Sequence, residues 1–219
     1  MEQSEVEPSL KHLQSAGSFL LGKRELVLSL VCFSVIPAIF LFVALQLTKV
    51  SGPQWLGSNF ENSYTYLFNS LLIVKREPPF HVDHPGTTTQ VFGAAVLEAS
   101  RHGSRDQLIA KVLHDPEKFL RRMHSALLIV CALAIWIFPW LTALRIGSYT
   151  TGVLLQFPIL FFRIVWQYSI WFDSDLTLVA ASIAAVSLCV VLLSEARRKN
   201  AKTRDLSIGG RHLRIGNRD

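Results

Sequence analysis

Long apolar stretches constrain this chain more than any other feature. Glu25–Leu47 and Ser125–Leu144 each approach the roughly 20 apolar residues that a helix needs to cross a bilayer. Leu176–Leu193 is nearly as long and carries no charge. Half of the 219 residues are hydrophobic and only 17% are charged, which is more apolar than a soluble domain of this size. The sequence therefore predicts an all-α integral membrane protein.

A further apolar segment, Gly152–Trp166, predicts a fourth span. It is shorter than the others and is interrupted by Pro158 and Arg163, so its polar groups must face protein and not lipid. Four transmembrane helices also fit the basic flanks, because Lys/Arg-rich short segments stay in the cytoplasm. These flanks are Lys23 and Arg24, Arg145, and the run that begins at Arg197. We expect a multi-pass protein of the inner cell membrane with both termini cytoplasmic.

This topology divides the chain into three regions. Residues 1–24 form a polar cytoplasmic tail, residues 25–194 the membrane region, and residues 195–219 a basic cytoplasmic tail for which we expect disorder. The net charge of +6 comes from that tail and from the outer loop. The tail has no interleaved aromatic residues, so contact with anionic membrane lipid is expected and nucleic acid is not.

The large first outer loop, residues 49–124, holds most of the side chains capable of chemistry. Ser63–Val74 has helical apolar spacing and predicts an interfacial helix that must end at the two prolines of REPPF. Thr89–Ser100 predicts a second short helix. Asp115 and Pro116 predict the N-cap and first position of a third.

Between the first two short helices lies HVDHPGTTTQ, residues 81–90, with three polar side chains in one tight turn. A metal site would need three or four converging ligands, and His81, Asp83 and His84 supply at most three, so we expect no metal. A solvated Pro-Gly turn is the plain alternative. A carboxylate at the membrane surface could instead act on a lipid-linked substrate. The three cysteines lie singly within apolar segments and imply neither a metal site nor a disulfide.

Two stretches taken together resemble the C-type membrane glycosyltransferases, in particular bacterial relatives of protein mannosyltransferases and of the lipid A aminoarabinose transferase. They are FENSYTYLFNSLL (Phe60 to Leu72) and PPFHVDHPGTTTQVFGA (Pro78 to Ala94), and HDPEKFLRRMHSALL (His114 to Leu128) is similar to the family's entry into its second span. The resemblance covers about residues 26–193. It implies transfer of a sugar from a polyprenyl-phosphate donor to an acceptor hydroxyl at the outer face of the membrane, with no cofactor.

The same resemblance assigns roles to particular residues. Glu61 stands where the family usually has the catalytic Asp, and Asp83 is the second acid. The candidates for binding the donor are Tyr64, Tyr66, His84 and Arg163. The alternative for the tyrosines is interfacial anchoring, and for Arg163 it is snorkelling to headgroups. Asp173 and Asp175 stand where relatives often show Pro-Glu, with an N-cap as the alternative.

The family usually has many more spans than this chain. The resemblance therefore also allows a truncated portion of an enzyme, or an enzyme that a partner chain completes. The alternative from a different class is a small, non-catalytic membrane subunit that binds lipid or a partner protein.

Overall fold

The computed structural model describes residues 23–56, 60–80 and 86–212, and for Lys23, Phe60, Glu61 and residues 201–212 it describes the backbone alone. All regular structure in these ranges is helical. Three helices are long and apolar enough to cross a membrane: Arg24–Val50 within α2, α6 (Pro116–Ile146), and Ser174–Asn200 within α10. The prediction of an all-helical chain with long membrane-type helices is confirmed.

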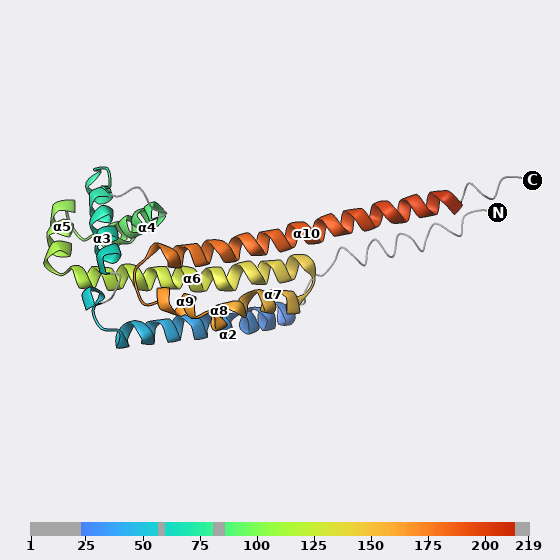
Figure 1. The fold of residues 1–219 in the computed structure, drawn as a ribbon, viewed down its shortest axis with the longest axis horizontal. Coiled ribbons are helices and arrows are strands. Elements are labelled where there is room, and N and C mark those ends of the chain that lie inside the picture. Colours follow the sequence, from blue (N-terminus) through green and yellow to red (C-terminus); the bar gives the residue numbers. More distant parts are fainter. Residues whose placement is uncertain (1–22, 57–59, 81–85, 213–219) are drawn as a thin grey trace, which may run out of the picture.

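The helices form a bundle with a cluster of short helices at one end (Figure 1). α2 (Lys23–Val50) runs toward this cluster and α6 runs away from it; α10 (Ser174–His212) then runs away beside α6. The cluster consists of α3 (Phe60–Lys75), α4 (Thr87–Ala99) and α5 (Arg105–His114), and we call it the cap. A 3-10 turn, η1 (Gln54–Leu56), leads from α2 to the cap.

The segment predicted as a fourth span is not one continuous helix. It consists of α7 (Tyr149–Gln156), α8 (Pro158–Phe161) and α9 (Arg163–Tyr168), which together run from the far end of α6 back toward the cap (Figure 1). Pro158 begins α8, and Phe162 adopts an extended conformation between α8 and α9. The polar interruption seen in the sequence therefore corresponds to two breaks in the helix.

Two prolines within the long helices explain how the broken segment is held. Proline has no N–H, so Pro37 in α2 and Pro139 in α6 leave the carbonyls four residues earlier without helical partners. These are the carbonyls of Phe33 and Ile135, and the buried amide Nε2 of Gln156 donates to both, at 3.0 and 2.9 Å. One side chain at the end of α7 thus satisfies the backbone of two neighbouring helices.

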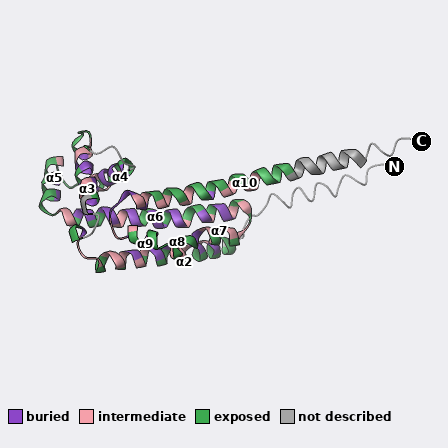
Figure 2. Ribbon diagram, in the orientation of Figure 1, coloured by how far each residue is buried: buried purple, intermediate pink, exposed green. Residues whose placement is uncertain are grey.

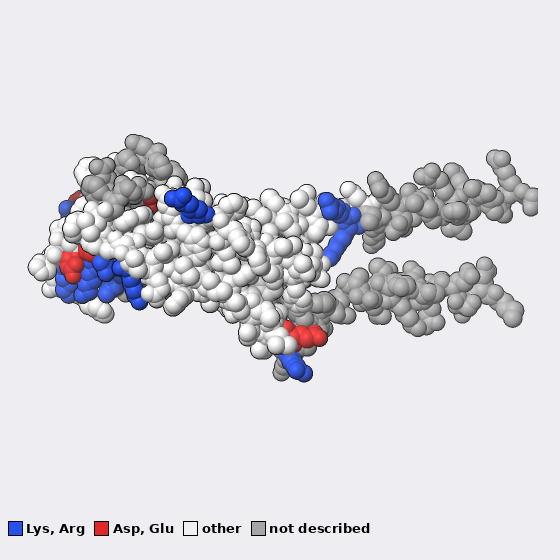
Figure 3. All heavy atoms as spheres, turned by 60° about the horizontal axis from the view of Figure 1, so that its bottom comes forward, with Lys and Arg blue, Asp and Glu red and all other residues white. Residues whose placement is uncertain are grey.

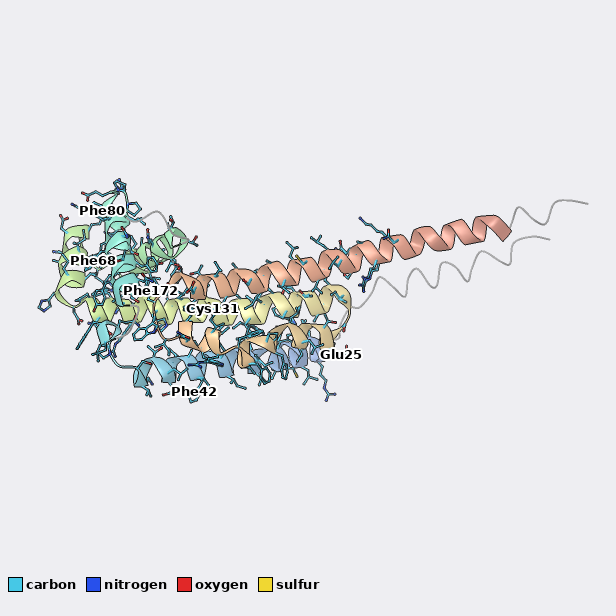
Figure 4. The ribbon with its side chains drawn as sticks, viewed as in Figure 1. Glu25, Phe42, Phe68, Phe80, Cys131 and Phe172 are labelled. Carbon is cyan, nitrogen blue, oxygen red and sulfur yellow. The ribbon has the colours of Figure 1, made fainter. Side chains whose placement is uncertain are left out.

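The core runs from the cap down the inner faces of α6 and α2. α6 is the most enclosed of the three long helices and α10 the least, with 44% and 11% of their most apolar windows buried (Figure 2). Phe172 lies fully buried where the cap meets the bundle, whereas Phe80 is exposed on the cap (Figure 4). The apolar side chains left exposed along α2 and α10 are suited to lipid contact.

Two of the three short helices of the cap, α3 and α4, agree with the sequence signals. α3 ends at Lys75, directly before Arg76, which adopts a left-handed conformation at φ 68°. The Asp115 side chain accepts a hydrogen bond from the Lys118 backbone N–H at 3.3 Å, with Pro116 beginning α6. α5 was not predicted, and the basic segment from Arg197, expected to be disordered, continues α10 as far as His212.

Candidate functional site

Of the two predicted catalytic acids, Glu61 alone lies in the described part of the chain. Glu61 lies in the first turn of α3, where the backbone alone is described. Asp83 lies outside the described residues, as do His81 and His84. The geometry of the candidate site is therefore built from the residues that flank these positions.

Both flanks of residues 81–85 contact one face of α3. The Phe80 backbone N–H donates to the Asn69 side-chain oxygen at 2.8 Å. Gly86 lies against the ring of Tyr66, and a Cβ at this glycine would overlap the Tyr66 Cε1 atom. Asn69 and Tyr66 are three residues apart on the helix and so share a face. The structure thus brings the two stretches that carry the family resemblance into contact.

Tyr66 is the link between the cap and α10. Its side chain is buried, its hydroxyl lies 3.1 Å from Ser174 Oγ at the start of α10, and its ring meets Phe172 edge to face. Burial raises the pKa of Tyr66, and the nearby charges of Asp173 and Asp175 act in the same direction against the hydrogen bond to Ser174. Tyr66 is therefore a neutral phenol at physiological pH.

Tyr64 lies in a second network, at the junction of η1, α3 and α6. Its hydroxyl donates to Glu117 Oε2 at 3.3 Å, and the Gln54 backbone N–H donates to Oε1 of the same carboxylate at 2.9 Å. Arg121 pairs with this carboxylate at 3.1 Å. Burial, followed by the charge of Glu117, raises the pKa of Tyr64. The hydroxyl predicted to bind donor is thus engaged within the protein.

Further polar contacts fix the cap on the turn between α9 and α10. Ser63 Oγ donates to the Phe172 carbonyl at 3.1 Å, and Gln54 Oε1 accepts from the Phe172 N–H at 3.3 Å. The Thr89 and Thr177 hydroxyls lie 3.0 Å apart. His124, fully buried in α6, has Nε2 at 3.0 Å from the Ser169 carbonyl. The turn is therefore held from the cap and from α6 together.

Directly below this turn the structure has a groove that the sequence did not reveal. It lies between the broken segment α7–α9 and α10 and has a volume of about 550 Å³. From Asp175 to Ser187 it follows α10 for about 18 Å at 1.5 Å per residue. Apart from Tyr168, Asp175, Ser182 and Ser187, every lining side chain is apolar.

The polar groups of the groove include Tyr168 and Asp175 near its cap end, where the charge of Asp175 acts on the Tyr168 phenol. Asp175 follows Ser174, the partner of Tyr66, and its charge acts on Tyr66, so the tyrosine motif in the cap lies close to the upper end of the groove. The buried Asp173 accepts from the Ser174 backbone N–H at 2.6 Å, directly before α10 begins. An N-cap side chain accepts from the second or third residue of its helix, so this contact does not test the capping alternative for Asp173.

Arg163 is separate from these contacts. It begins α9, its side chain is exposed, and it is not among the residues that line the groove, although its neighbours Phe162 and Ile164 are. Within the described part of the chain, no three His, Cys, Asp or Glu side chains gather as metal ligands would. Cys32, Cys131 and Cys189 are free thiols.

The comparisons with known proteins add no relative. No family model, no curated protein and no solved structure matches this chain.

Proposed function

We propose that this chain binds a polyprenyl-phosphate-linked sugar and takes part in transferring the sugar to an acceptor hydroxyl at the non-cytoplasmic face of the inner cell membrane. The groove between α7–α9 and α10 would hold the isoprenoid tail, and the cap would hold the sugar phosphate. The observation that carries this proposal is the closeness of the cap to the groove: Tyr66 contacts Ser174, and the next residue, Asp175, lines the groove.

The groove suits a lipid tail because of its chemistry and its place. It is largely apolar, it follows a helix long enough to cross a membrane, and its polar pair of Tyr168 and Asp175 lies at the cap end. A tail in the groove would leave its phosphate near that end, because a charged group is costly within the hydrocarbon region.

The proposed orientation follows from charge. Arg145 at the end of α6 pairs with Glu195 at 2.9 Å, and Arg198 donates to the Ile146 carbonyl at 2.8 Å. Lys and Arg atoms are visible at the end of the bundle opposite the cap (Figure 3). Arg24 at the start of α2 lies at this same end. A basic membrane edge is typical of the cytoplasmic side. The cap would then lie outside, with the segment α7–α9 completing four crossings.

In the proposed reaction the oxygen of the acceptor hydroxyl attacks the anomeric carbon of the sugar, and a carboxylate of the protein accepts the hydroxyl proton. The bond between the sugar and the phosphate breaks, and the polyprenyl phosphate leaves. Glu61 and Asp83 are the proposed acids, with His84 and Arg163 as proposed contacts to the donor. Glu61 carries one methylene more than the family's usual Asp, and a base misplaced by about 1 Å can lose about a hundredfold in rate.

The test is a transfer assay on membranes that contain this chain, alone and with any partner encoded beside it. Glu61→Gln and Asp83→Asn should each abolish turnover of a polyprenyl-phosphate sugar, and Glu61→Asp should raise it. Asp106→Asn removes an exposed cap carboxylate and is the matched control. Absence of turnover in both preparations, or unchanged turnover in both variants, would refute the transferase proposal.

A non-catalytic lipid-binding subunit is the second candidate. The contacts of Tyr64 with Glu117 and of Tyr66 with Ser174 favour it, because both motif hydroxyls already have partners inside the protein. This candidate predicts that donor lipid binds the chain without turnover in any preparation.

A further inference from the structure

The corner where α5 meets α6 has a hollow surrounded by cationic side chains. Its volume is about 390 Å³, and it is lined by Lys111 and His114 from the last turn of α5 and by Lys118 from the first turn of α6. The three side chains are exposed and form no hydrogen bond or ion pair with the rest of the described chain. The remaining lining residues are Ala110, Asp115 and Phe119.

The next turn of α6 extends this cluster. Arg122 lies four residues after Lys118 on the same face and stacks over the Phe119 ring at 5.4 Å, while Arg121 is paired with Glu117. Residues 111–122 contain four Lys or Arg side chains and only two acidic ones. One of the two acidic residues, Asp115, also caps α6. Lys and Arg atoms gather visibly at this end of the molecule (Figure 3).

One electrostatic preference opposes Lys118 at this position. The first turn of a helix carries the positive end of its dipole, which favours an anion over Lys. Lys111 lies in the last turn of α5, where the dipole favours a cation, so it carries no such penalty. An anion bound between these side chains would offset the penalty at Lys118.

The face of α6 below the corner identifies the kind of anion. At 100° per residue, Lys118, Arg122, Ile129 and Leu133 fall within about 60° of one another. Ile129 and Leu133 are exposed, 48% and 42%, and they begin about 10 Å below Arg122. A cationic hollow thus lies directly above an apolar strip on the same face of a membrane helix.

We infer that the α5–α6 corner binds the phosphate of a membrane lipid in the leaflet on the cap side, with the acyl chains of that lipid along Ile129 and Leu133. Lys111, Lys118 and Arg122 supply the charge, and His114 adds a donor in the hollow. This site lies on α6 and is distinct from the groove beside α10, so it does not depend on the proposed transferase activity.

The test uses the full chain in nanodiscs of phosphatidylcholine with a minor fraction of phosphatidylglycerol, and counts the lipids that remain bound after extraction by mass spectrometry. The chain should retain phosphatidylglycerol selectively. Lys111→Gln, Lys118→Gln and Arg122→Gln should each lower its relative affinity about fivefold, as expected for one basic residue at an anionic membrane surface. Lys49→Gln, which removes an exposed cation near the cap end of α2, should not change it.

Separate arms identify the source of the phosphate. Soluble glycerol phosphate or inorganic phosphate at millimolar concentration should fail to displace phosphatidylglycerol, because neither has chains to lie along α6. Ile129→Ser with Leu133→Ser should weaken lipid retention while leaving the cationic corner intact, and a helical circular dichroism spectrum checks that each variant is folded. Equal loss in Lys49→Gln, no loss in the three variants, or displacement by the soluble phosphates would overturn the inference.

Discussion

The side-chain amide nitrogen of Gln156 lies 3.0 Å from the carbonyl oxygen of Phe33, which is the oxygen that Pro37 leaves without a partner in α2. The same nitrogen meets the carbonyl oxygen that Pro139 leaves free in α6. A buried polar residue in the broken segment thus compensates for two helix-breaking residues elsewhere. Because this segment forms one wall of the groove, these hydrogen bonds also position the groove.

Replacing Gln156 should therefore destabilise the bundle. Gln156→Leu removes both hydrogen bonds while keeping an apolar side chain, and the expected loss is about 1–2 kcal/mol, since individual hydrogen bonds inside membranes contribute about 0.6 kcal/mol on average and two buried carbonyls lose their partner. The measurement is unfolding of the detergent-solubilised chain.

A control distinguishes the loss of these two hydrogen bonds from a general packing defect at residue 156. Pro37→Ala with Pro139→Ala restores the two helical N–H groups, so Gln156→Leu should cost less in that background than in the native chain. Equal costs in both backgrounds would show that the proline carbonyls are not what Gln156 stabilises.

The contact between Gly86 and Tyr66 predicts that a larger residue at position 86 destabilises the fold. A methyl group at residue 86 would overlap the Tyr66 ring, so Gly86→Ala should cost about 1–3 kcal/mol of stability by overpacking. Tyr66→Leu makes space and should recover part of that loss in the double variant. Thr87→Ala, at the next and exposed position, is the control and should be neutral. Additive effects of the two substitutions would mean that they do not share this contact.

The proposed orientation can be tested with introduced cysteines in a chain whose three native cysteines are replaced by Ala. Lys49→Cys lies at the cap end and Arg145→Cys at the opposite end. In intact cells a membrane-impermeant maleimide should label only Lys49→Cys, and lysis should expose Arg145→Cys. The reverse pattern would place the cap in the cytoplasm and end the proposal of an external active site.

Local signals in the sequence predicted much of the fold. Ser63–Val74 corresponds to α3 and Thr89–Ser100 to α4, because apolar spacing, prolines and glycine act over a few residues. α5 also had a local signal, the capping box of Ser104 and Gln107, which apolar periodicity alone does not reveal.

The groove could not be predicted in this way. Its walls come from residues about 20 positions apart, such as Ile159 and Val179, and its shape depends on breaks at Pro158 and Phe162 that long-range contacts of Gln156 support. Pro158 indicated an interruption, but nothing near it in the sequence indicates which helices the broken segment meets. The hydrogen-bond partners of Tyr64 and Tyr66 lie more than 50 and 100 residues away along the sequence, so they could not be predicted for the same reason.

The most direct test of the central claim is photo-crosslinking of donor lipid to the groove. A photoreactive phenylalanine analogue at Ser182, inside the groove, should capture a labelled polyprenyl-phosphate sugar in a saturable manner, and unlabelled donor should compete whereas phosphatidylcholine should not. The same analogue at Phe42, on the exposed face of α2, should give only weak labelling that does not saturate. Labelling that is equal at the two positions, or that unlabelled donor fails to reduce at Ser182, would contradict the assignment of the groove to a polyprenyl-phosphate donor.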